Sequence, residues 1–193
     1  LICPGSTLTL EHVAVNPTRI GIINILNAMG GDIRLINERE VAGEPVADIV
    51  VNYKPLVGIE IPQDQIPLAI DEFPAIFIAA AYAKGDTVLH GASELRLKES
   101  DRIEAMANGL DILGIDNEVF EDGIRITGGS LDGGCVDSQG DHRIAMAFII
   151  AGLRAKAPII VANCANIATS FPSFVQAAQA VGIKVTQSLE NEL

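Results

Sequence analysis

Basic side chains recur at the beginnings of the helices that this sequence predicts. Arg19, Lys98, Arg102 and Arg143 each lie at or just before an apolar, helix-like stretch. A helix N-terminus carries unpaired N–H groups and a partial positive charge, so it attracts anions and disfavours a cation by about 0.3–1 kcal/mol. Taken singly, each of the four residues has a simpler interpretation as a solvated surface charge. Four cations placed against the same local preference together indicate a site for phosphate or carboxylate groups.

The densest cluster is Lys-Glu-Ser-Asp-Arg at residues 98–102. Lysine supplies a compact point charge, whereas arginine supplies a planar fork that matches phosphate and carboxylate. Glu99, between the two cations in sequence, is suited either to hold their geometry or to act as an acid–base group. The structural alternative is an ordinary helix start with Ser100 or Asp101 as the cap and with pairing between residues four apart. Spacing alone leaves both interpretations open.

Acidic residues stand at the same helix starts. Asp71 and Glu72 precede one apolar stretch, and Asp141 precedes another. Acids at these positions stabilise helices as caps and as partners of the helix dipole, so capping is an alternative explanation for all three. His142, between Asp141 and Arg143, is of a type that carries protons. No second histidine stands near it, and we therefore expect no metal site.

Hydrophobic periodicity predicts alternating strands and helices that would position these clusters. The first expected strand spans 8–15, and the first helix is expected to begin with Asn16 as N-cap and Pro17 as its first residue and to run to Met29. The glycine-rich stretch 128–134 predicts a flexible turn. The other expected helices are 71–84, 100–113, 141–156 and 172–181, and the other expected strands are 32–37, 47–51, 58–61, 87–90, 117–120, 124–127, 159–162 and 183–186.

One pattern in the chain recurs 70 residues later: the stretch that begins at Asp71 aligns with the stretch that begins at Asp141. Solenoid repeats have periods of about 20–50 residues, so this period favours a larger α/β (α+β) unit of the βαβαββ kind. We expect repeats over roughly 1–85, 86–157 and a partial 158–193. A helix–glycine–strand unit also occurs three times, as NAMGGDIRLI, DILGIDNEV and QAVGIKVTQ. The alternative is that each of these glycines merely ends its own helix. That alternative does not account for the matched order of elements.

The composition excludes several classes of protein. A hydrophobic content of 49% argues against disorder, and a net charge of −12 argues against binding nucleic acid. The apolar stretches 75–83 and 144–153 are about half of a membrane span, so no membrane contact is expected. Three cysteines without paired spacing favour reduced thiols and a cytoplasmic location, and no targeting segment is visible. Because the chain starts with Leu1 inside a strand-like pattern, we expect it to be an excerpt from a longer chain.

Five stretches carry a family resemblance: PGSTLTLEHVAVNPTRIGIINILNAMGGDI, IDEFPAIFIAAAYAKG, ELRLKESDRIEAMANGLDILG, DHRIAMAFIIAGL and NIATSFPSF. Together they resemble the EPSP synthase (3-phosphoshikimate 1-carboxyvinyltransferase) family over essentially all 193 residues, in the C-terminal half of such an enzyme. The resemblance implies one lobe of an enolpyruvyl transferase, built from repeated βαβαββ units around a pseudo-threefold axis.

The resemblance also implies a reaction. The carboxyvinyl group of phosphoenolpyruvate (PEP) moves to the 5-hydroxyl of shikimate 3-phosphate, and phosphate leaves. Asp71 takes the position that contacts the shikimate hydroxyls and is the candidate general base. Glu99 takes the position of a second acid–base residue, the candidate proton donor to the methylene carbon. No metal or organic cofactor is implied.

The remaining site residues follow from the same resemblance. Three residues match positions that hold the phosphate and carboxylate of PEP, namely Lys98, Arg102 and Arg143. Three others are expected to support the site, namely Asp141, His142 and Arg19.

The sequence departs from one common family pattern near its end. Many members carry Lys-Thr-Phe-Pro where this chain has Thr169-Ser170-Phe171-Pro172, so one PEP-side lysine is absent. The family's remaining contacts to shikimate 3-phosphate lie in a second lobe that this sequence lacks. We therefore expect the substrates to bind between this lobe and the missing one, and the isolated chain to be inactive. The alternatives are a non-catalytic anion-binding lobe of a multifunctional chain and a UDP-N-acetylglucosamine enolpyruvyl transferase, although the latter family lacks the LKESDR and DHRIAMAF pair.

Overall fold

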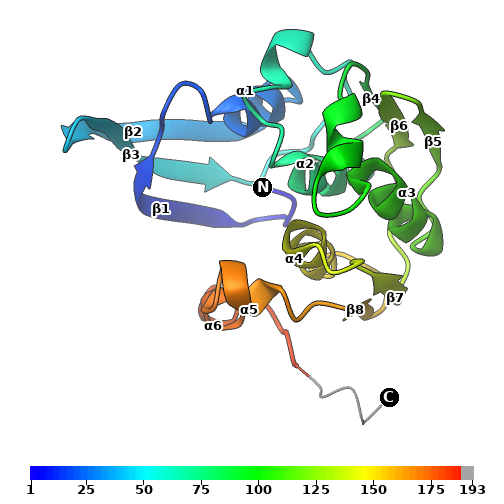
Figure 1. The fold of residues 1–193 in the computed structure, drawn as a ribbon. Coiled ribbons are helices and arrows are strands. Elements are labelled where there is room, and N and C mark those ends of the chain that lie inside the picture. The colour runs from blue at the N-terminus through cyan, green and yellow to red at the C-terminus, as the bar shows by residue number, and fades with distance from the viewer. Residues whose placement is uncertain (188–193) are drawn as a thin grey trace.

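Strands and helices alternate along the chain in the computed structural model, which describes residues 1–187 (Figure 1). The strands are β1 (Thr7–Ala14), β2 (Asp32–Val41), β3 (Glu44–Asn52), β4 (Asp86–Leu89), β5 (Asn117–Phe120), β6 (Gly123–Thr127), β7 (Gly134–Asp137) and β8 (Ile159–Ala162). The α-helices are α1 (Gly21–Ala28), α2 (Phe73–Ala81), α3 (Arg102–Ile112), α4 (His142–Ala151), α5 (Ile167–Ser170) and α6 (Phe174–Ala180), and the 3-10 helices are η1 (Gln63–Gln65) and η2 (Ser93–Leu97).

Two of the sheets have the same topology. Their strand orders are β1-β3-β2 and β4-β6-β5, antiparallel throughout, so the strand that comes last in sequence lies in the centre of each sheet. In each of these three-stranded units an α-helix joins the first strand to the second (α1 and α3), and another α-helix comes after the third strand (α2 and α4). The parallel pair β7–β8 also has a counterpart, because parallel bridges join Val57 to Lys84 and Glu60 to Val88. The strand expected over 58–61 is present only as these isolated bridges.

Helix α2 lies at the centre of the core. Eight of its nine residues are buried, and it packs against α1, α3 and α4. A helix that is apolar on all sides belongs inside a protein rather than on its surface. Figure 1 shows α2, α3 and α4 gathered between the sheets. The first turns of these helices consequently lie near one another, and the candidate site is built there.

The prediction that a helix begins at Asn16 is wrong. The side-chain Oδ1 of Asn16 accepts a hydrogen bond from the backbone N–H of Thr18 at 3.0 Å, and the N–H of Arg19 donates to the carbonyl of Asn16 at 2.8 Å. Asparagine therefore closes a turn instead of capping a helix, which is its common alternative use. Helix α1 begins only at Gly21, where a Cβ atom would lie 2.6 Å from the backbone of Leu68.

Other boundaries differ for local reasons. β2 and β3 are longer than expected because they form a hairpin closed by Ala42 and Gly43, whose φ angles are 52° and 85°. Positive φ at both central residues is the turn geometry that suits a tight hairpin. The strand expected over 183–186 is absent, since no other described strand pairs with this segment. The glycine-rich turn ends earlier than expected, because Gly134 already belongs to β7.

Among residues 1–187, no helix is long and apolar enough to cross a membrane.

The contact between α3 and α4 generates a stability prediction. Gly109 of α3 faces the ring of Phe148 in α4, and a Cβ atom on Gly109 would lie 2.2 Å from the ring Cζ. We expect Gly109→Ala to lower the free energy of unfolding by up to about 2 kcal/mol, because overpacking costs about 1–3 kcal/mol and outweighs the roughly 1 kcal/mol gained in helix propensity. Urea unfolding measures the change. Asn108→Ala, on the exposed face of the same helix, is the matched control and should be neutral or slightly stabilising. An equal increase in the free energy of unfolding in both variants would show that Gly109 does not pack tightly against Phe148.

Candidate active site

The guanidinium of Arg102, the first residue of α3, is fully buried at the centre of the candidate site. Its Nε donates to Oδ2 of Asp141 at 2.8 Å, and its Nη2 donates to a carboxylate oxygen of Glu99. Its Nη1 lies 3.6 Å from Oδ1 of Asp71 and has no hydrogen-bond partner among the described residues. A buried cation is tolerated only when it is paired, and here three carboxylates surround it. The Nη1 group is a donor left available at the Asp71 side.

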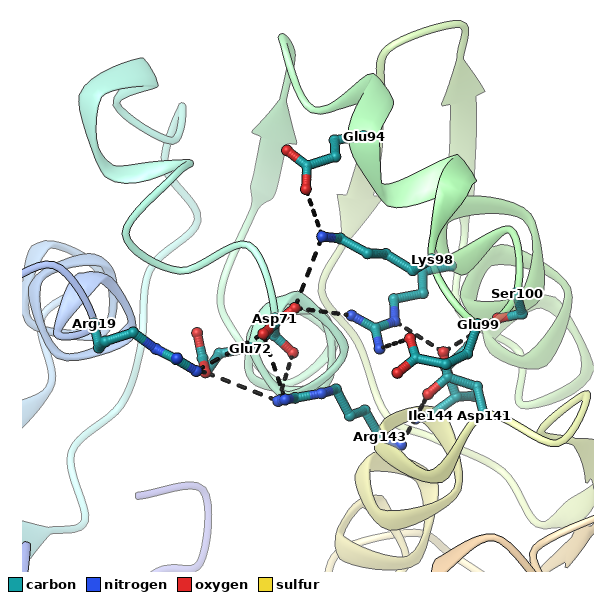
Figure 2. A network of polar contacts seen from close by, with 11 residues as sticks. Arg19, Asp71, Glu72, Glu94, Lys98, Glu99, Ser100, Asp141, Arg143 and Ile144 are labelled. Atoms are coloured by element: carbon teal, nitrogen blue, oxygen red, sulfur yellow. Dashed lines mark hydrogen bonds and ion pairs between the residues drawn. The ribbon is translucent and has the colours of Figure 1, made fainter. Parts of the chain in front are cut away.

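Asp71, in the turn before α2, is the hub of the network (Figure 2). Its two carboxylate oxygens lie within ion-pair distance of all four basic residues. The separations are 3.5 Å to Arg143, 3.6 Å to Arg102, 3.7 Å to Arg19 and 3.9 Å to Lys98. The backbone carbonyl of Asp71 also accepts a hydrogen bond from Nη1 of Arg143 at 3.2 Å. The structure thus brings together the cations that the sequence places at separate helix starts.

Asp141 both caps α4 and holds Arg102. Its Oδ1 accepts hydrogen bonds from the backbone N–H groups of Arg143 and Ile144, and its Oδ2 accepts from Arg102 and from the hydroxyl of Ser100. Burial by itself raises the pKa of this carboxyl, but the hydrogen bond and charge of Arg102, with the helix N–H groups, lower the pKa below its usual value. Asp141 is therefore a helix cap and, at the same time, a buried ion-pair partner of Arg102.

Two acidic residues complete the network, and sequence reasoning did not assign them to it. Glu72 lies 3.9 Å from both Arg143 and Arg19, and Glu94 accepts a hydrogen bond from Lys98. Burial raises the pKa of Glu72 in spite of its cationic neighbours. Neither Asp71 nor Glu72 makes a side-chain cap on α2. The sequence contained a signal for each of them. Glu72 is adjacent to Asp71, and Glu94 stands four residues before Lys98.

The Lys98–Arg102 cluster is a bend that leads into α3. Lys98 is extended, Asp101 caps the helix by accepting from the N–H of Glu104, and α3 begins at Arg102. Lys98 and Arg102 are therefore not neighbours along a helix. Arg96 fixes the bend, because its guanidinium donates to Asp101 at 2.6 Å and to the carbonyl oxygens of the β5–β6 turn, at Phe120 and Glu121.

One of the expected supporting residues, His142, does not join the network. His142 is the first residue of α4, and no hydrogen bond of its side chain is found among residues 1–187. Thr169 and Ser170, where many family members carry Lys-Thr, lie in α5 and outside the network. Asn166, which precedes α5, donates a hydrogen bond to the carbonyl of Gly140. The described part of the chain holds no group of three or more acidic, histidine or cysteine side chains suited to a metal ion.

The network contains four cations and five carboxylates. The carboxylates hold the cations in place, but they also leave the network without an excess of positive charge. A cavity of about 310 Å³ adjoins it. Asp71, Glu72 and Arg143 form one end of this cavity, and apolar residues of α2 and α4 form most of the rest. The arrangement is suited to orienting an anionic ligand at the polar end, next to a carboxylate that can exchange a proton.

The buried pair Arg102–Asp141 generates a prediction for stability and its pH dependence. We expect Asp141→Asn to lower the free energy of unfolding at pH 7 by about 3 kcal/mol, the lower end of the range for breaking a buried ion pair. The pKa of Asp141 is lowered on folding, so its stabilisation is present above the unfolded value of about 3.9 and is lost as the pH falls through the folded value. The difference in free energy of unfolding between the parent chain and Asp141→Asn should therefore become smaller at acidic pH.

Urea unfolding at a series of pH values measures this gap. Asp132→Asn removes an exposed pair with Lys156 and should change the stability by no more than about 0.5 kcal/mol. An Asp141→Asn effect as small as that of the control would show that the buried pair is not a main contributor.

Comparison with known proteins identifies the family. The model of the EPSP synthase (3-phosphoshikimate 1-carboxyvinyltransferase) family matches residues 1–177. The 3-phosphoshikimate 1-carboxyvinyltransferase of Methylococcus capsulatus is 60% identical over 187 residues, which are 97% of this chain and 43% of the relative. The enzyme of that name from Legionella pneumophila (strain Paris) is 59% identical over 96% of this chain and 43% of its own length.

Solved structures agree with this assignment. An EPSP synthase from Acinetobacter baumannii superimposes with a TM-score of 0.93 at 52% identity and covers 96% of this chain and 44% of that protein. The enolpyruvyl transferase NikO from Streptomyces tendae, at 18% identity and a TM-score of 0.72, covers 95% of this chain and 40% of its own, and shows the shared fold alone. The chain thus spans less than half the length of these relatives. With its mixed sheets and helices, it has the enolpyruvyl transferase fold and belongs to the EPSP synthase family.

Proposed function

We propose that this chain is one lobe of a two-lobe enzyme that transfers the carboxyvinyl group of PEP to the 5-hydroxyl of shikimate 3-phosphate. The observation that carries the proposal is the position of four cations 3.5–3.9 Å from the Asp71 carboxylate, where the starts of α2, α3 and α4 meet. Both substrates carry phosphate, and PEP carries a carboxylate as well. The part of the chain that the family model matches, residues 1–177, contains all the residues of this cluster.

Binding of PEP falls to the basic residues in this proposal. Lys98 and Arg143 lie close to Asp71 with side chains that are only partly exposed, and the Nη1 of Arg102 is a free donor on the same side. Charge-assisted hydrogen bonds from such groups to phosphate and carboxylate are about twice as strong as neutral ones. An arriving anion takes the place of Glu94 and Asp71 as the partner of these cations. Arg19, which is 63% exposed, supports the outer edge of the same cluster.

Two carboxylates share the proton transfers. Asp71 accepts the proton of the 5-hydroxyl, whose oxygen forms a bond to C2 of PEP, while Glu99 donates a proton to the methylene carbon C3. Release of phosphate from C2 and loss of a proton from C3 then restore the double bond. Glu99 is half-exposed, and it stays oriented through its contact with Arg102. Asp141 acts indirectly, by fixing Arg102 from the other side.

The charge of the network supports the proposal that a second lobe completes the site. Because its carboxylates outnumber its cations, this lobe alone offers little net attraction to substrates that carry several negative charges. Further cations from the second lobe would supply it. We propose that residues 1–193 form a single lobe with repeats near 1–85, 86–157 and 158–193, the last six residues lying outside the described part. We also propose a cytoplasmic location. No particular observation favours the two alternatives, a non-catalytic lobe or a transferase that acts on UDP-N-acetylglucosamine.

The proton-donor role of Glu99 predicts a separation of catalysis from binding. In the complete enzyme, Glu99→Gln should lower kcat by about 10²–10⁴-fold, the usual contribution of a positioned acid or base, while KM for PEP changes little. Steady-state kinetics measure both constants. Glu104→Gln, an exposed position two residues after Arg102, is the matched control and should keep full activity. An unchanged kcat in Glu99→Gln would remove the assigned role.

The isolated chain has its own prediction. Since the network has no excess of positive charge, we expect the 193-residue chain to be inactive and to bind PEP only weakly. Isothermal titration calorimetry tests this directly, with far-UV circular dichroism to verify that the chain is folded. Micromolar affinity for PEP in the isolated chain would contradict the proposal that the site is shared between two lobes.

A further inference from the structure

A second cavity lies at the opposite ends of two of the helices that begin at the candidate site. It has a volume of about 230 Å³. Tyr82 and Lys84 follow α2, Arg154 follows α4, and Tyr53 and Lys54 follow β3, and all five line the cavity. Since α2 has nine residues, its two ends are about 14 Å apart. None of the residues of the Asp71 network lines this second cavity.

The cavity gathers cations that have no carboxylate partner among residues 1–187. The sequence contains 13 Lys and Arg residues, and nine of them form ion pairs within the described part of the chain. Among residues 1–187, the others are Lys54, Lys84, Arg154 and Lys184. Three of these four line the cavity, and no acidic residue does. In a chain with a net charge of −12, such a local excess of positive charge stands out from the surroundings.

Structural roles account for only part of this cluster. Lys84 and Arg154 follow the C-terminal ends of helices, where the helix dipole stabilises cations. Arg154 also donates from Nη1 to the carbonyl of Ile2 at 2.9 Å, and its guanidinium lies 4.8 Å from the centre of the Tyr82 ring. Lys54 follows a strand, and no hydrogen bond or ion pair of its ammonium group is found within residues 1–187. The helix dipole therefore does not explain why a third cation faces the same space.

We propose that this cavity is a second anion site, which binds a small phosphate monoester. Arg154 is held by Tyr82 and Ile2, so its remaining donors present a fixed fork, and Lys54 and Lys84 add point charges on flexible stems. The volume is below the roughly 300–1,000 Å³ that is usual for drug-sized ligands, which favours a small ligand. The hydroxyl of Tyr82 already donates to the carbonyl of Ala151, so recognition depends on the cations. This site is additional to the proposed reaction and does not depend on it.

The aromatic content of the chain provides a direct readout. The sequence has no tryptophan and two tyrosines, and both tyrosines line this cavity. We expect the tyrosine fluorescence of the 193-residue chain to change saturably on titration with glycerol 3-phosphate and with inorganic phosphate. Uncharged glycerol should leave it unchanged. Added sodium chloride should weaken the response, because the contacts are ionic.

Substitutions test whether the fluorescence change arises from binding in this cavity. The double variant Lys54→Gln/Lys84→Gln should bind glycerol 3-phosphate at least about tenfold more weakly, the scale of one charge-assisted hydrogen bond. Lys184→Gln changes a basic residue that lies outside the cavity and has no ion pair within residues 1–187; it is the matched control and should bind as the parent chain does. Arg143→Gln, in the candidate active site, should leave the tyrosine response intact, so the result is independent of the proposed reaction.

Three results would overturn the proposal: no saturable change with either phosphate, an equal response to glycerol, or unchanged affinity in the double variant. Thermal unfolding of every variant accompanies the titrations. The substituted lysines are exposed, so the lysine variants should unfold at the temperature of the parent chain.

Discussion

Neutralising the buried guanidinium of Arg102 is the constraint on which the site depends. An unpaired charge at this depth would cost several kcal/mol, so the fold must bring carboxylates to it. They come from separate parts of the chain: Asp71 from the turn before α2, Glu99 from the bend before α3 and Asp141 from the N-cap position that precedes α4. The three helices cannot move apart without exposing this ion or leaving it unpaired. The same contacts therefore hold the core together at one end and set the spacing of the candidate site.

Much of the fold was predictable, because strands and helices differ in their hydrophobic period and because the matched stretches 70 residues apart indicate a repeated unit. The errors lie where one residue type serves two purposes. Asn16 looks the same in sequence whether it caps a helix or closes a turn, and only its contact with Thr18 distinguishes the two. The segment 183–186 has a strand-like composition, but a strand also requires a partner, which composition cannot supply.

The site was predictable to the extent that charge conflicts with local preference. Cations at helix starts, together with the family motifs, were sufficient to select Lys98, Arg102 and Arg143. Burial was not predictable, since an arginine in a charged cluster normally suggests a solvated side chain, whereas Arg102 is fully buried. The inclusion of Glu72 and Glu94 depends on where long side chains turn in space, which spacing alone does not determine.

The burial of α2 separates the outer surface of the chain from the candidate site. Eight of the nine helix residues are hidden from solvent, and the residues that hold Asp71 in place are likewise interior or belong to the network itself. Ions in solution screen charges beyond about 8 Å at physiological salt. Surface positions remote from the network can therefore gain or lose acidic residues, and so alter the net charge of the chain, while the distances around Asp71 stay the same. The exposed members of the network, Arg19, Glu94 and Glu99, are the exceptions.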